Sequence, residues 1–290
     1  MKNTIYDENN LVMCRDTPDM IDISGNNIDE FLNDKNAEIE YLEDGTMMRL
    51  YYNASMDKWM CATNNKNDAN DAYWSSSKSF GDMFWEIIGE EYDNFIRVLD
   101  KNFTYFFILM HTENIHIINI KTNLLIYLYS LNNENEDLCK IFPVKLFDFV
   151  KAPIKYNHKN HNSFLKKRGL CICYDNKIFY KYDFYFFTRI KIARGNKPNI
   201  VKRFLELMIV DDYKNMNILK KYYKNFKFDD IIDFINNLYN DYIDSHVKHE
   251  KTITNVETLK WCKKLHYIYK TFNTKINKKT VIKMLSENSF

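Results

Sequence analysis

The chain has 290 residues, of which 46% are apolar and 16% aromatic, with only 6 Gly and 4 Pro. This length and composition support a folded core and exclude collagen-like, low-complexity and disordered chains. No apolar run is longer than that at residues 105–110, which is far shorter than the ~20 residues of a membrane-spanning helix. The first ten residues lack a signal-peptide pattern. We therefore expect a cytoplasmic protein with no membrane partner.

The charge is distributed unevenly along the chain, although the formal net charge is only +2. Residues 1–100 contain 8 basic and 21 acidic residues, whereas residues 140–203 contain 16 basic and 3 acidic ones and residues 246–290 contain 10 and 3. Two arrangements fit this pattern: the acidic part pairs with the basic segments inside the molecule, or the basic segments present a surface to a polyanion such as nucleic acid.

The first part of the chain has the pattern of short strands. Residues 46–52 and 58–63 are apolar and aromatic runs around a five-residue loop, which predicts a β-hairpin. Residues 79–88 carry apolar side chains at helical spacing and predict an amphipathic helix. Further strands are expected at residues 105–110, 115–120 and 124–129, and a second hairpin at residues 169–174 and 177–182.

The last part of the chain has helical periodicity. Apolar residues recur every three or four positions over residues 200–210, 218–226, 228–244, 258–272 and 279–286. Gly195 and Pro198 interrupt any regular element before these segments. The sequence thus predicts an α+β protein, with an antiparallel-sheet domain over residues 1–195 and an all-helical domain over residues 196–290.

Several short motifs follow one another within the predicted sheet domain. They are, in chain order, Asp44-Gly45-Thr46 at the first hairpin, the polar turn at residues 63–66, the strand and turn at residues 107–114, and the pair Arg168-Gly169-Leu170 and Tyr180-Lys181-Tyr182 in the second hairpin. Over roughly residues 38–195 this order resembles the covalent nucleotidyltransferase superfamily, specifically the phage-type ATP-dependent RNA ligases. The resemblance implies a ligase-like nucleotidyltransferase domain, ATP and Mg²⁺ as cofactors, and single-stranded or nicked RNA as partner. It also implies nucleotide contacts from Asp44, Gly45, Arg49, Lys66 and Lys181.

Three positions depart from the family pattern. The family's nucleophilic lysine, two residues before the motif aspartate, corresponds to Leu42, whose aliphatic side chain cannot attack a phosphate. The carboxylates of two later motifs correspond to Ile108 and Arg168. No catalytic residue is therefore assigned, and the pattern is that of a pseudoenzyme that keeps its binding groups.

Basic residues near aromatic rings suggest where RNA would lie, because lysine and arginine attract phosphates and rings stack on bases. The candidate RNA-binding residues are Trp74, Lys78, Lys166, Lys167, Arg168, Arg194 and Lys197. Three of the predicted contact residues also have an explanation that involves no ligand. Trp74 fits a core residue next to the predicted helix, Arg49 a surface strand arginine, and Lys181 one more lysine of a lysine-rich region.

Cysteine and histidine spacing predicts no metal site, and we expect the six cysteines to be reduced. Three functions are consistent with the sequence: an RNA-ligase-like protein that engages RNA ends for repair or modification, a non-enzymatic RNA-binding protein on a decayed ligase scaffold, and an interaction module that uses the acidic N-terminal part. The abundance of Asn, Lys, Ile and Tyr is typical of an AT-rich genome, such as that of a large DNA virus or a cytoplasmic element.

Overall fold

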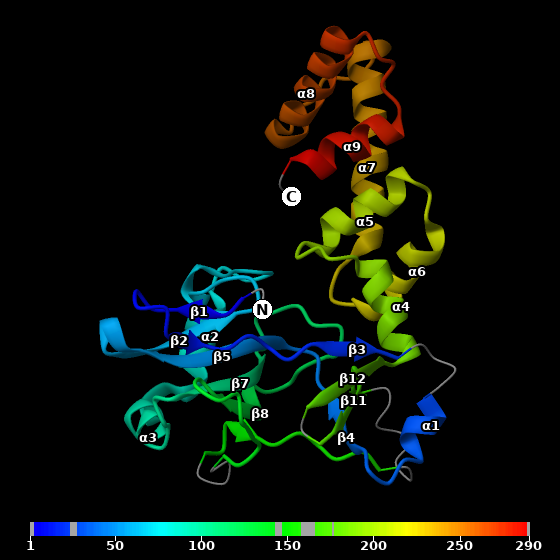
Figure 1. Cartoon of the computed structure of the whole chain (residues 1–290). Helices are drawn as coiled ribbons and strands as arrows, with labels where there is room; N and C mark the ends of the chain where they lie inside the picture. The colour runs from blue at the N-terminus through cyan, green and yellow to red at the C-terminus, as the bar shows by residue number, and fades with distance from the viewer. Residues whose placement is uncertain (1–2, 24–27, 143–146, 158–165, 176, 289–290) are drawn as a thin grey trace. The chain divides into compact units, whose positions relative to one another are not determined.

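The computed structural model describes residues 3–23, 28–142, 147–157, 166–175 and 177–288 (Figure 1). The chain forms two compact units, Met1–Thr188 and Arg189–Phe290. The first unit contains the sheets, and the second is helical. The predicted fold class, an α+β protein with antiparallel sheets followed by helices, is confirmed.

The larger sheet of the first unit has six strands in the order β10-β8-β7-β5-β6, with β9 beside β8. Neighbours are antiparallel except for β10, which runs parallel to β8. The strands are β5 (Thr46–Asn53), β6 (Lys58–Thr63), β7 (Phe103–Met110), β8 (Leu124–Asn132), β9 (Leu138–Cys139) and β10 (Val150–Lys151). The predicted hairpin at residues 46–63 is confirmed as β5 and β6.

The smaller sheet has the order β3-β12-β11-β4. Its strands are β3 (Met20–Asp22), β4 (Glu38–Leu42), β11 (Gly169–Tyr174) and β12 (Ile178–Asp183), and a separate ribbon joins β1 (Ile5–Tyr6) to β2 (Val12–Cys14). The predicted hairpin at residues 169–182 is confirmed as β11 and β12. The two sheets pack on each other where the rings of Tyr129 in β8 and Phe179 in β12 lie 5.9 Å apart.

Short helices complete the first unit: α1 (Ile28–Leu32), α2 (Phe80–Ile88) and α3 (Tyr92–Arg97). The helix predicted at residues 79–88 is confirmed as α2. Its N-terminus carries a capping box between Ser79 and Asp82, and it buries Met83 and Phe84 against the larger sheet. This packing forms the main hydrophobic core of the unit.

The strand predicted at residues 115–120 is wrong, since this segment forms no regular element. The backbone N–H groups of Ile117 and Ile118 donate to the Asp44 carboxylate. The Asp44 side chain, which is far away in the sequence, therefore accepts the hydrogen bonds that the carbonyls of a neighbouring strand would accept in a sheet.

The helical part consists of α4 (Tyr185–Arg194), which contains the boundary between the units, α5 (Ile200–Ile209), α6 (Tyr213–Tyr222), α7 (Phe228–Tyr242), α8 (Val256–Phe272) and α9 (Lys278–Glu287). A π-helical turn at Ile243–Val247 extends α7. The second unit's core includes Leu205, Leu238, Leu265 and Leu285. Among the described residues, no helix combines the length and apolar character needed to cross a membrane.

Candidate nucleotide and nucleic-acid site

The segments that carry the family resemblance meet where the chain passes from one sheet to the other. Leu42, at the end of β4, pairs with Gly169 of β11, and the backbone N–H of Arg168 donates to the Leu42 carbonyl at 3.0 Å. Gly169 pairs in turn with Asp183 of β12. We call this region the junction and define it as residues 42–45, Ile108, residues 167–169 and Asp183.

Two glycines of the junction are required by close packing. A Cβ atom on Gly45 would lie 2.4 Å from Ile108 Cγ2 and 2.5 Å from the Leu109 carbonyl oxygen. A Cβ atom on Gly169 would lie 2.0 Å from the Tyr182 carbonyl oxygen. Packing alone thus explains why these positions are glycine, and the nucleotide contact assigned to Gly45 stays a prediction.

The Asp44 side chain fixes the loop after β7. Its Oδ2 accepts hydrogen bonds from the N–H groups of Ile117 at 2.6 Å and Ile118 at 2.9 Å. Two backbone donors on one carboxylate oxygen make a strong, charge-assisted anchor. Asp44 therefore has a structural role, next to which a nucleotide contact stays a prediction.

Arg49 is buried inside the first unit rather than on a strand surface. Its Nη1 donates to the carbonyls of Asn3 at 2.6 Å and Arg15 at 3.2 Å, and its Nη2 donates to the Thr63 carbonyl at 2.7 Å. The guanidinium group holds the N-terminal ribbon and the end of β6 together. These bonds favour a structural role over a nucleotide contact.

Most cations predicted to contact nucleotide or RNA take part in ion pairs. Lys78 pairs with Glu86 and Glu113, Lys167 with Glu43, Arg168 with Asp183, Lys181 with Asp22, and Lys197 with Glu206. Of the other predicted residues, Lys66 and Lys166 are exposed, Trp74 is half-buried and Arg194 is buried. Within the first unit, two of these pairs, Lys167 with Glu43 and Lys181 with Asp22, join the acidic segment to the basic one, as the first of the two charge arrangements expects.

Three ion pairs at or near the junction differ in how deeply they are buried. The side chains of Glu43 and Lys167 are 6% and 17% exposed, and Arg168 Nε lies 2.8 Å from Asp183 Oδ1 with its guanidinium carbon 5.4 Å from the centre of the Phe187 ring. In the pair of Lys181 with Asp22, at 2.9 Å, the aspartate side chain is 77% exposed. Opening a buried pair leaves an uncompensated charge, whereas an exposed pair contributes little. Of these three pairs, that of Lys181 is therefore the least costly to open, because its carboxylate partner stays in contact with water.

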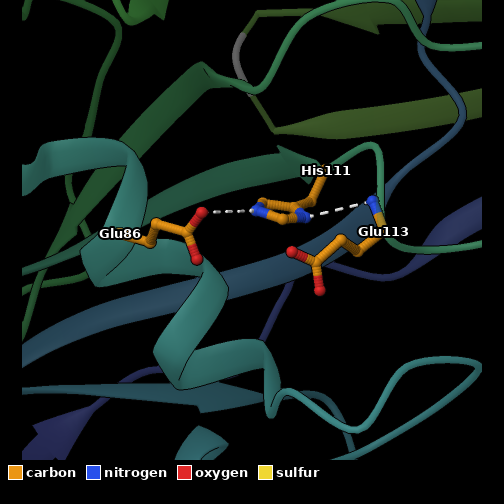
Figure 2. Close-up of side chains that lie close together, drawn as sticks. All are labelled: Glu86, His111 and Glu113. Atoms are coloured by element: carbon orange, nitrogen blue, oxygen red, sulfur yellow. Dashed lines mark hydrogen bonds and ion pairs between the residues drawn. The ribbon is translucent and has the colours of Figure 1, made fainter.

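Glu86, His111 and Glu113 form a cluster that could hold a metal ion, because one ligand atom from each lies within 4.8 Å of the others (Figure 2). Sequence reasoning missed this cluster because Glu86 lies on α2 and the other two follow β7. His111 is buried, with Nδ1 3.3 Å from the Glu113 N–H, and Nε2 3.1 Å from Asn123 Nδ2 and 3.7 Å from Glu86 Oε1.

The Lys78 ammonium already serves this cluster as a cation. It lies 2.6 Å from an oxygen of Glu86 and 2.6 Å from an oxygen of Glu113, and its hydrogen bond lowers the pKa of the Glu113 carboxyl. A metal ion would have to displace Lys78 from both carboxylates. The cluster is better explained as a set of ion pairs and hydrogen bonds that hold α2 against the end of β7 than as a metal centre.

No protein-family model and no curated protein matches this chain. Among solved structures, it is similar to an archaeal ATP-dependent RNA ligase, with a TM-score of 0.49 and 7% identity over 98% of this chain and 85% of that one. A protein of Aquifex aeolicus, described provisionally as an ATP-dependent DNA ligase, has a TM-score of 0.47 and 9% identity. This match covers 90% of this chain and 76% of that one. A mutant of a Naegleria gruberi RNA ligase has a TM-score of 0.38 and 12% identity, and the match covers 59% of this chain and 57% of that one. Because the TM-scores of these three structures are below 0.5, the similarities establish neither the fold nor the function of this chain.

Proposed function

We propose that this protein binds single-stranded or nicked RNA at its ends, on a ligase-like scaffold, without forming a lysyl-nucleotide. The supporting observation is the junction, where three of the motif segments are neighbours: β4, which leads into Asp44-Gly45, pairs with β11 at Gly169, and β11 pairs with β12, which carries Lys181. By the resemblance in motif order, Leu42 corresponds to the nucleophile, and Ile108 and Arg168 correspond to two carboxylates.

Within this proposal, Lys181 makes the first contact with a phosphate. Its partner Asp22 is largely exposed, so exchanging that carboxylate for a phosphate leaves no buried charge behind. Lys167 and Arg168 keep their partners, Glu43 and Asp183, and hold β11 against β4. In this proposal, ATP and Mg²⁺ are ligands only, and ATP forms no covalent adduct with the protein.

The alternative of an acidic interaction module has less support. Several acidic side chains of the first unit are already bound to cations of the same unit, among them Glu38 with Lys140 and Glu43 with Lys167. A basic partner would have to compete with these intramolecular pairs. In an active ligase, a lysine at another position than 42 would be the nucleophile, and we would expect it to be Lys35 or Lys66, which flank the Asp44-Gly45 hairpin.

The test combines labelling and binding on the full chain. Incubation with ATP or GTP radiolabelled at the α-phosphate, with a divalent metal ion, is expected to leave no label on the protein after denaturing electrophoresis. A labelled band would contradict the proposal, and peptide mapping would then identify the lysine.

Fluorescence anisotropy with single-stranded and nicked RNA is expected to show binding that weakens with salt. We expect Lys181→Gln to lower the slope of log affinity against log salt by about 0.7, the value for one phosphate contact on a single strand. Lys177→Gln, an exposed lysine of the same hairpin, is the matched control and should leave the slope unchanged. Absence of RNA binding by the wild-type chain would overturn the proposal.

A further inference from the structure

One face of α8 presents a row of lysines around a tyrosine. The residues lie three or four positions apart, which places them on one side of a helix: Lys260, Lys263, Lys264, Tyr267 and Lys270. We call this row the α8 stripe. Tyr267 is 68% exposed, and the buried Cys262 and Leu265 lie on the opposite side, in the core of the helical unit.

The α8 stripe is cationic and lacks the neutralisation found in the first unit. The only acidic residue of α8 is Glu257, in its first turn. Among the described residues, Lys260, Lys263 and Lys270 make no ion pair within 4.0 Å. Like charges at these spacings destabilise a helix, so a bound polyanion would relieve a repulsion that the protein leaves uncompensated.

A hollow lies beside the last turns of α8, and its walls include Ile268 and Phe272 of this helix but no residue of the α8 stripe. It has a volume of about 450 Å³, and its apolar walls come from Ile209, Ile268, Phe272 and Met284. The charged residues Lys279, Lys283 and Glu287 also line it. Phe272 is 68% exposed, so an apolar ring is available to a ligand here. Apolar walls with a few polar groups are typical of sites for small organic groups, and this volume lies within their usual range.

We propose that the α8 stripe and this hollow bind single-stranded RNA, with the lysines on phosphates, Tyr267 stacked on one base and the hollow taking another. This rests on the proposed function, namely that the protein binds RNA, and assigns a contact to the helical unit. A single strand is required because only unpaired bases expose their faces to a ring. A membrane surface does not fit, because the apolar side of α8 is already buried in the core.

The experiment measures anisotropy of a fluorescent single-stranded oligouridine with the full-length protein over a range of salt concentrations. The test variant carries Lys260→Gln, Lys263→Gln and Lys270→Gln. The matched control carries Lys214→Gln, Lys221→Gln and Lys224→Gln, which remove the same charge from exposed positions of the same unit. We expect the salt slope to fall by about 2 in the test variant, at ~0.7 per contact, and to stay unchanged in the control.

Tyr267→Ala separates stacking from charge. We expect it to weaken oligouridine binding by roughly 5- to 150-fold, the range for losing one stacked base, while binding of inorganic polyphosphate stays unchanged. Tyr267→Phe should restore RNA affinity, since it keeps the ring.

Each remaining result would contradict the inference. RNA binding by all variants with the wild-type slope, or an equal loss in the control, would overturn the assignment to α8 and leave the proposed function intact. Equal weakening of RNA and polyphosphate binding by Tyr267→Ala would overturn the stacking contact. Preferential binding of anionic lipid vesicles would identify a membrane surface, and not RNA, as the partner of the α8 stripe. Absence of RNA binding by the wild-type protein would overturn the proposed function as well.

Discussion

The buried guanidinium of Arg49 shows how a single residue can organise a fold without touching a ligand. Three carbonyls, from Asn3, Arg15 and Thr63, accept its hydrogen bonds, and they come from three separate segments of the chain. Removing the guanidinium would leave these acceptors without their donor in the interior, which is more costly than the loss of the bonds themselves.

We expect Arg49→Met to lower the free energy of unfolding of the first unit by about 3 kcal/mol or more. Arg97→Met, at an exposed position of the same unit, should change it by less than about 0.5 kcal/mol. Urea unfolding followed by tryptophan fluorescence measures both. A stable Arg49→Met protein that had lost RNA binding would instead assign Arg49 to the ligand.

The cysteines offer a second prediction for single residues. Burial raises the pKa of the Cys14 and Cys171 thiols to about 12 and that of Cys61 well above its ordinary value. A raised thiol pKa keeps the group protonated and unreactive at lower pH. At about pH 8, near the ordinary thiol pKa, these three should react slowly with a thiol reagent, and all six free cysteines should react quickly once the protein is unfolded. Mass spectrometry of the labelled peptides would show this, and rapid labelling of Cys14 in the native protein would contradict the buried position.

Among the secondary-structure elements, those with a local signal could be predicted from the sequence. The hairpins follow from alternating patterns around polar turns, and α2 from its apolar spacing and the Ser79 cap. The start of α6 at Tyr213, five residues before the predicted helix, depends on the Asp212 cap, whose side chain accepts from Asn215. Residues 115–120 could not be predicted, because the carboxylate that binds them lies more than 70 positions away.

At the junction, the neighbouring segments could be predicted from the sequence, but their ion pairs could not. The motif order indicated that residues 42–45, residues 168–170 and Lys181 belong together, and their strands are neighbours in the smaller sheet or at its edge. The ion pair between Lys167 and Glu43 spans 124 positions, so no sequence spacing indicates it. Its consequence, a neutralised junction, becomes visible only in three dimensions.

The Asp44 anchor yields a prediction for the loop after β7. Asp44→Ala removes the acceptor of the Ile117 and Ile118 N–H groups, so these amides should exchange with solvent faster by a factor of ten or more, corresponding to about 1.4 kcal/mol. Asp93→Ala, at an exposed position on α3, is the control. Hydrogen exchange read by NMR or mass spectrometry decides the matter, and unchanged exchange at these two amides would show that the loop is held by other contacts.

For the whole molecule, the sequence predicts separate cores on either side of the Gly195–Pro198 turn, and this boundary stays a prediction. Leu205 and Met208 pack with residues of α7, α8 and α9, as a helical unit with its own core requires. Gly195 has a φ of +61° and ends α4, and Asn199 caps α5, so the intervening residues form no regular element.

We therefore expect limited proteolysis to cut first between residues 191 and 202, giving two fragments that remain folded and differ in hydrogen-exchange protection. Far-UV circular dichroism of the separated fragments would measure their structure. Resistance of this segment to protease, together with aggregation of residues 1–195 expressed alone, would instead indicate one continuous core.

The three-residue link between β4 and β5 has a mechanical consequence. An extended chain of three residues reaches only about 10 Å, and the strands on both sides of this link are paired with neighbours in their own sheets. Gly45 is packed against Ile108 and the Leu109 carbonyl, so the link has no slack with which to lengthen or swing. Within the first unit, this link limits how far the ends of β4 and β5 can separate, and so how far the two sheets can part at the junction. A ligand at the junction would meet a surface whose shape is set before binding, with little of its affinity lost to reorganising the sheets.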